Sequence, residues 1–237
     1  MRGGIFTGTT QYGGGGNCAF PGSTGCGIVF QLAPPSTPGG AWTENILYRF
    51  QGGRDGAFPS GGLLLDRAGN LYGATAAGGN TATCIANEIG CGTVFRLQRP
   101  TRAGGAWKET VLYTFQGGAD GFVPSNLAAD ESGDLYSVTV YGGAFVCQCG
   151  SVFKLSHPST GAGPWTKTVL HTFQGIPNGQ TFGDGSEPIL GVTFDSKGNL
   201  YGVTAFGGVF IGGVEGGSSY GTVYWMAPPA ELVCRPT

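Results

Sequence analysis

Charge is scarce in this sequence. Only 11% of its 237 residues are Asp, Glu, Lys or Arg, and the formal net charge at pH 7 is −2. Without a basic patch, the chain is not expected to bind the phosphates of nucleic acids. No run of 18 apolar residues occurs, so membrane insertion is not expected either.

Signals for helices and for common catalytic sites are also few. No window shows a helical period with caps, and no phosphate loop or dinucleotide fingerprint follows a strand. The two histidines, His157 and His171, are too few for a His-rich metal site. The segment GSSYG at 217–221 has the letters of a nucleophile elbow, but it leads into a predicted strand and not a helix. We therefore expect no such elbow.

Glycine, in contrast, is abundant. The chain has 48 glycines, about 20% of its length, where about 7% is usual. They follow no collagen period and lie between apolar runs, and 40% of the residues are hydrophobic. This combination indicates many tight turns in a packed structure, not disorder.

A six-residue pattern occurs four times in the chain. It reads NLYGAT at 70–75, DLYSVT at 134–139 and NLYGVT at 199–204, with a weaker copy, IFTGTT, at 5–10. Three other landmarks recur with it in fixed order: a Gly-rich turn with Asp-Gly and Pro, a GTVF-type segment, and an alternating segment opened by a Trp (Trp42, Trp107 or Trp165). A repeat of this length is a strong guide to fold.

Each unit is predicted to hold four strands. In the second unit they lie near Gly62–Asp66, Asn70–Ala76, Gly92–Leu97 and Trp107–Phe115, where apolar and polar residues alternate between turn signals. We count three strands in the first unit, four in each of the next two and three in the last. The segment AELVCRP at 230–236 is a weak fifteenth.

Four-stranded units repeated in line are typical of an all-β fold, the β-propeller. The sequence predicts a single propeller domain over residues 1–237, with units at roughly 4–50, 61–115, 125–173 and 189–235. We favour a closed four-bladed propeller with incomplete terminal blades. A fragment of a larger propeller is the alternative.

These motifs resemble a known repeat. The combination NLYGAT, GTVFRL and WKETVLYTFQGGADG, over about residues 4–226, is similar to the GloVer (Gloeo/Verruco-type) tandem repeat of secreted bacterial proteins. More weakly, FDSKGNLYGVT is similar to the strand hairpin of NHL-type propellers. The resemblance implies a secreted or surface-anchored propeller, but no catalytic residues.

We expect function on the face that carries the long Gly-rich loops and the Asp-Gly turns, since the opposite face has only short turns such as DRAGN. The repeated Asp55, Asp120 and Asp184 would form a ring there that binds a hydroxyl-rich ligand or Ca²⁺. One Asp per turn supplies few of the six to eight oxygen ligands that Ca²⁺ usually takes. The favoured alternative is a carboxylate that accepts N–H bonds within its turn. No other cofactor is expected.

Carboxylates that break the repeat are candidates for catalysis. Glu88, Glu187 and Glu215 lie in loops of the same face, and Asp184 is three residues from Glu187. A pair of carboxylates about 5–10 Å apart suits glycoside hydrolysis. If the protein is an enzyme, Asp184, Glu187 and Glu215 are its predicted catalytic residues; solvated loop carboxylates are the alternative.

Aromatic residues are candidates for ligand binding. Tyr12, Tyr141 and Phe206 each precede Gly-Gly at the same place in the repeat, where they would stack on sugars or pack between blades. The three repeat tryptophans would cover blade edges, with a sugar site in an outer groove as the alternative. His171 replaces Tyr48 and Tyr113 of the sister units and is interpreted as a packing variant.

Seven cysteines suggest the compartment. Cys18 would pair with Cys26 and Cys84 with Cys91, whereas a bond between Cys147 and Cys149 would be strained; Cys234 would meet one of those two if the ring closes. Disulfides favour an extracellular or periplasmic location. The N-terminus has no segment of signal-peptide length, so we expect that a signal was removed or, as we favour, that the sequence begins inside a longer one.

Three functions remain open at this point. A module that binds extracellular polysaccharide or a surface ligand is favoured, because similar loops can give several similar sites. A polysaccharide hydrolase or lyase is the second, and a passive structural repeat of a larger surface protein the third. Fold alone does not choose among them.

Overall fold

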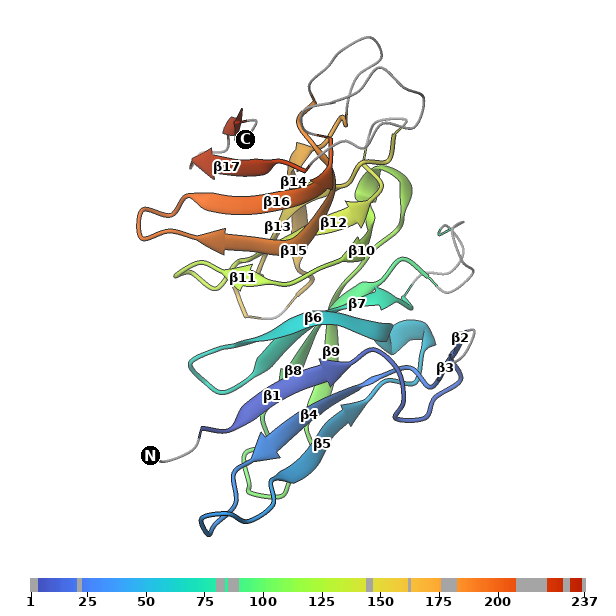
Figure 1. Ribbon diagram of the computed structural model, residues 1–237, viewed down its shortest axis with the longest axis vertical. Helices are drawn as coiled ribbons and strands as arrows, with labels where there is room; N and C mark the ends of the chain where they lie inside the picture. The colour runs from blue at the N-terminus through green and yellow to red at the C-terminus, as the bar shows by residue number, and fades with distance from the viewer. Residues whose placement is uncertain are drawn as a thin grey trace.

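The computed structural model describes residues 4–20, 23–79, 84, 90–143, 147–161, 163–175, 183–207, 221–227 and 231–235. They form four antiparallel sheets that follow one another along the chain (Figure 1). The first sheet comprises β1 (Phe6–Thr10), β4 (Ile28–Ala33) and β5 (Thr43–Arg49); the second β6 (Ala57–Leu65), β7 (Leu71–Ala77), β8 (Thr93–Gln98) and β9 (Lys108–Thr114). The third comprises β10 (Phe122–Pro124), β11 (Ala128–Ala129), β12 (Leu135–Tyr141), β13 (Ser151–Ser156) and β14 (Thr166–Thr172); the fourth β15 (Ser186–Phe194), β16 (Leu200–Phe206), β17 (Val223–Ala227) and β18 (Glu231–Arg235).

Every sheet is an antiparallel meander, as in a propeller blade. In the third sheet β10 and β11 both pair with β12 and together take the place of one edge strand. The four strands predicted for the second unit are confirmed, although β6 begins earlier, at Ala57. The weak fifteenth strand is also present as β18, which pairs with β17 and gives the fourth sheet four strands. A short hairpin of β2 (Ala19–Phe20) and β3 (Ser23–Thr24) was not predicted.

The repeated hexapeptide forms the strand that lies second in each complete sheet. Its leucine is buried, with Leu71 and Leu135 each 1% exposed. Its glycine makes room for the aromatic ring of the next strand, because a Cβ at Gly73 would lie 2.6 Å from the ring of Phe95. Gly8 and Gly202 make the same room in the first and fourth sheets, whereas the third sheet has Ser137 at this position. The buried leucine and, in three of the four copies, this glycine therefore serve the packing of the sheet.

One apolar cluster fills each junction between neighbouring sheets. An edge-to-face aromatic pair recurs in all three junctions: Phe50 with Phe95 at 5.1 Å, Phe115 with Phe153 at 5.3 Å, and Phe173 with Tyr224 at 5.1 Å. Since burial of such side chains is the main favourable term in folding, neighbouring sheets stabilise one another.

A backbone contact also repeats at each junction. The N–H groups of Phe58, Val123 and Glu187 donate to the carbonyls of Cys26, Cys91 and Cys149 at 2.9, 3.0 and 2.9 Å. All three donors have positive φ, between 51° and 56°. The next residue is always Pro, which packs against a glycine that follows the cysteine; a Cβ on Gly27 would lie 2.4 Å from Cδ of Pro59. The Asp-Gly-x-x-Pro motif thus docks each sheet on the previous one.

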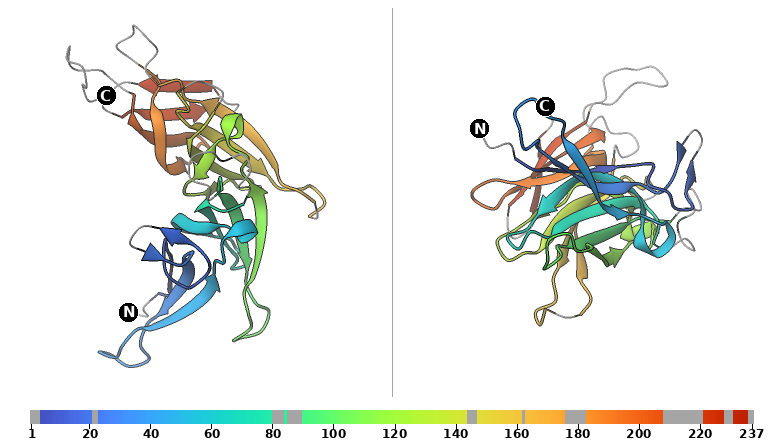
Figure 2. Two further views of the ribbon diagram at one scale, coloured as in Figure 1. Left: turned by 90° about the vertical axis from the view of Figure 1, so that its right-hand side faces the viewer. Right: turned by 90° about the horizontal axis from the view of Figure 1, so that it is seen from below.

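The four sheets form a curved row, with the first and fourth at opposite ends (Figures 1 and 2). Within the described residues the row does not close into a ring, so closure and the number of blades stay predictions. Phe6, which occupies the place of Leu71 in the first sheet, is 60% exposed, because within the described residues no preceding sheet covers it as the first sheet covers Leu71.

Three disulfides lie in the loops that precede the third strand of a sheet. Cys18–Cys26 and Cys84–Cys91 are bonded as predicted. The sequence left the pairing of Cys147, Cys149 and Cys234 open, and the structure joins Cys147 to Cys149, with their Cα atoms 5.1 Å apart. Cys234 lies in β18. In the part of the chain described here, no helix is long and apolar enough to span a membrane.

Candidate functional site

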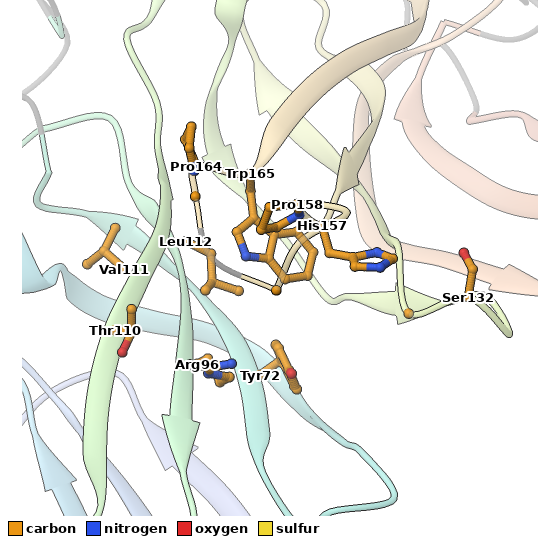
Figure 3. Close-up of a pocket in the computed structure, with 13 residues that line it drawn as sticks. Tyr72, Arg96, Thr110, Val111, Leu112, Ser132, His157, Pro158, Pro164 and Trp165 are labelled. Atoms are coloured by element: carbon orange, nitrogen blue, oxygen red, sulfur yellow. The ribbon is translucent and has the colours of Figure 1, made fainter.

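A groove of about 500 Å³ lies between the second and third sheets (Figure 3). On one side it is lined by β7, β8 and β9 of the second sheet, with Tyr72, Arg96 and Leu112. On the other side it is lined by the β13–β14 hairpin, including His157 and Trp165. Its volume is in the range of about 300–1,000 Å³ usual for small-ligand sites.

Trp165 is held by the hairpin that it ends. The hairpin turns where the N–H of Gly161 donates to the carbonyl of Pro158 at 3.0 Å. The indole packs against the apolar cluster of the second and third sheets, so it is only partly buried and keeps surface toward the groove. The indole therefore supplies an apolar surface at the groove wall.

His157 is fixed by Asp134, which precedes β12. The His157 N–H donates to Oδ1 of Asp134 at 3.0 Å, and ring Nδ1 lies 2.8 Å from the same oxygen. Lys154 pairs with the other oxygen at 2.6 Å. Although burial acts to raise the pKa of Asp134, hydrogen bonds from Lys154 and His157 outweigh it and hold this pKa at about 2. Asp134 is thus ionised and organises the hairpin end of the groove.

Tyr72 is positioned by the β6–β7 turn. Its hydroxyl donates to Oδ2 of Asp66 at 3.2 Å, while Oδ1 of Asp66 accepts the N–H groups of Ala68 and Asn70 at 2.9 and 2.8 Å. Burial, followed by the charge of Asp66, raises the pKa of Tyr72. The phenol therefore stays protonated near neutral pH, donates to Asp66 and accepts a hydrogen bond from the side chain of Arg96.

Each aspartate of the predicted ring forms hydrogen bonds within its own turn. The fourth strand of each unit (β5, β9 or β14) is its outer strand, and a glutamine follows it. The backbone N–H of this glutamine donates to the turn aspartate in all three units: Gln51 to Asp55 at 2.9 Å, Gln116 to Asp120 at 2.8 Å and Gln174 to Asp184 at 2.8 Å. Each aspartate also binds the outer strand, through Tyr48, Tyr113 or His171, at 3.0, 2.8 and 2.9 Å. His171 thus replaces a tyrosine as hydrogen-bond partner. No group of three or more Cys, His, Asp or Glu suited to a metal occurs among the described residues.

The carboxylates predicted for catalysis are only partly described. Glu187 does have counterparts in the repeat, since its N–H and φ match those of Phe58 and Val123. Its side chain hydrogen-bonds Tyr141 and, after burial, raises the pKa of that phenol. Asp184 is held by His171, and Glu88 and Glu215 lie outside the described residues. Because Glu215 lies outside the described residues, the catalytic trio stays a prediction.

The predicted loop aromatics lie at sheet junctions. Tyr12 meets Phe58 of the second sheet edge-to-face at 5.4 Å, and Tyr141 lies 5.4 Å from Phe122. Phe206, in the fourth sheet, is 47% exposed. These rings are spread along the row and do not line the groove.

The face opposite the Gly-rich loops carries longer hairpins than the sequence predicted. The expectation of only short turns there was wrong, because the hairpins before β5, β9 and β14 project from that side (Figure 2). Their signal was present as PPSTPGGAW at 34–42, RPTRAGGAW at 99–107 and HPSTGAGPW at 157–165. Each ends on a repeat tryptophan, and the last forms a wall of the groove.

Comparison with known proteins places the chain in a family. A family profile described as the Gloeobacter/Verrucomicrobia repeat matches residues 1–233, so the chain belongs to this repeat family. Among curated proteins nothing matches it. A solved structure with some likeness is a GH43 protein, the BlXynB K247S mutant from Bacillus licheniformis, at 14% identity and a TM-score of 0.46. The match covers 98% of this chain but 40% of that one.

Proposed function

We propose that the chain is an extracellular glycan-binding module of β-propeller type, and that its site is the groove walled by Trp165. The supporting observation is that the indole of Trp165 lines a groove of about 500 Å³ together with Tyr72 and Arg96 of the neighbouring sheet. The C–H face of a sugar stacks on an aromatic ring, while guanidinium, phenol and imidazole groups bind its hydroxyls. Of the two predictions for the repeat tryptophans, a blade-edge cover or a sugar site in an outer groove, this arrangement favours the sugar site for Trp165.

The extracellular part of the proposal rests on the disulfides. Three loops carry a cystine, and such bonds persist in oxidising compartments. The charge content of 11% also suits recognition of polymers through apolar faces and hydroxyls more than through bulk electrostatics. Calcium remains an untested expectation, since the three turn aspartates are already engaged within their own turns.

Binding is favoured over catalysis for this site. Glycoside hydrolysis needs two carboxyl groups about 5–10 Å apart. Among the described residues that line the groove, none is Asp or Glu. Hydrolase, lyase and passive spacer functions therefore have no observation in their favour comparable to the groove.

Affinity electrophoresis through a panel of plant and microbial polysaccharides tests the proposal. We expect selective retardation by one glycan without loss of the polymer, and no retardation of Trp165→Ala. Trp42→Ala is the matched control, because Trp42 has the same place in the repeat but is 47% exposed beside Phe6. Binding that survives Trp165→Ala, or no binding to any glycan, would refute the groove as a glycan site.

A further inference from the structure

Two cations occupy the same place in neighbouring sheets. Arg96 of β8 lies opposite Tyr72, and Lys154 of β13 lies opposite Tyr136, in the same register. Both tyrosines donate their hydroxyl to the aspartate of the preceding turn. The second and third sheets therefore offer one cation each, in matched surroundings.

Only one of these cations has an internal counter-charge. Lys154 pairs with Asp134 at 2.6 Å. The residue equivalent to Asp134 in the second sheet is Asn70, which precedes Leu71 as Asp134 precedes Leu135. The amide of Asn70 donates to Asp66 at 2.8 Å and accepts the N–H of Arg99 at 3.0 Å. The carboxylate that neutralises the sister cation is thus replaced by a neutral amide.

Arg96, which lines the groove, lacks a carboxylate partner within the described ranges. No ion pair within 4.0 Å joins it to a carboxylate in the described part of the chain, although its side chain donates a hydrogen bond to the hydroxyl of Tyr72. Its Nε–H is buried and has no hydrogen-bond partner among the described residues. Figure 3 shows Arg96 beside Tyr72, with Trp165 and His157 on the hairpin that faces them. Because the Nε–H is buried, an anion in the groove would have to bind the terminal Nη–H groups, which can hold a planar carboxylate through two parallel N–H bonds.

We propose that the groove selects an acidic saccharide, whose carboxylate binds Arg96 while a sugar ring stacks on Trp165. This deepens the proposed function and rests on it. The chemical class is a uronic acid unit, because it combines a sugar face with a carboxylate on the same ring. The carboxylate of such a unit would pair with Arg96 as Asp134 pairs with Lys154 in the third sheet.

The test uses polygalacturonate and its fully methyl-esterified form, which differ only in charge on the same sugar chain. Wild type is expected to bind the acid at least tenfold more tightly than the ester, in titration calorimetry at fixed salt. Arg96→Gln should remove roughly tenfold to a hundredfold of the affinity for the acid and leave the weak affinity for the ester unchanged. Lys197→Gln is the control, because it removes one positive charge from the exposed turn between β15 and β16 of the fourth sheet, and it should leave both affinities unchanged.

Asn70→Asp gives a second, independent variant. It places a carboxylate where the third sheet has one, so Arg96 would be neutralised from within and affinity for the acid should fall toward that of Arg96→Gln. Equal binding of acid and ester, or unchanged binding in both variants, would overturn the selectivity. The proposed function would stand if a neutral glycan still bound through Trp165, and would fall if no glycan did.

Discussion

The junction between the first and second sheets and the junction between the second and third are built alike but carry opposite charge. Asp55 and Asp120 hold the same turn in both. At the facing position of the next outer strand, the first junction has Glu109 and the second has Lys167. The comparison teaches that the repeat fixes the backbone and the turn aspartate, whereas the residue that meets this aspartate varies.

In the second junction the two facing charges, Lys167 and Asp120, form an ion pair. Nζ of Lys167, whose side chain is 4% exposed, bonds both the carbonyl and Oδ1 of Asp120, the latter at 2.8 Å, and lies 5.0 Å from the ring centre of Phe115. In the first junction Oδ1 of Asp55 and Oε1 of Glu109 are buried with no hydrogen-bond partner in the described residues. Burial, and then the charge of Asp55, raises the pKa of Glu109 to about 7.

The largest effect is expected from breaking the complete junction. Lys167→Gln leaves Asp120 partly buried without its cation, so the free energy of unfolding should fall by about 3 kcal/mol. Denaturant unfolding at pH 7 measures it. Glu44→Gln, at the same place in the exposed outer strand β5, serves as control and should change stability by less than about 0.5 kcal/mol. Equal losses in both variants would show that the Lys167 pair is not special.

Making the first junction like the second should have a smaller effect of opposite sign. Glu109→Lys removes a carboxylate that repels Asp55 and supplies an ammonium next to it. We expect the free energy of unfolding at pH 8 to rise by about 2 kcal/mol. The same variant with Asp55→Asn should lose most of this gain, and an equal gain without Asp55 would contradict the pairing.

The smallest effect is on the pH dependence of stability. The pKa of Glu109 is raised in the folded state to about 7 from 4.5, so the folded chain binds more protons than the unfolded chain between these values. The stabilisation is therefore complete below about pH 4.5 and is lost as pH rises through 7. Allowing for solvent screening, wild type should lose about 1 kcal/mol more than Glu109→Gln between pH 5 and pH 8. Parallel pH curves for the two proteins would exclude the shift.

The sequence predicted the strands well because they depend on local signals. The alternation around Val111 and Tyr113 and the Asp-Gly turns define strands and hairpins within one unit. The groove could not be predicted, because it depends on how the β13–β14 hairpin of one sheet lies against the outer strands of another. For the same reason Trp165 was interpreted as a blade-edge cover, and the missing counter-charge of Arg96 was visible only once Asn70 and Asp134 could be matched in space.

A crystal structure of the chain with trigalacturonate tests the central claim most directly. The account predicts a sugar ring on the indole of Trp165, with a carboxylate within hydrogen-bond distance of the Arg96 guanidinium. Sugar bound only on the loop face, beside Tyr141 or Phe206, would contradict the assignment of the site to the groove between the second and third sheets.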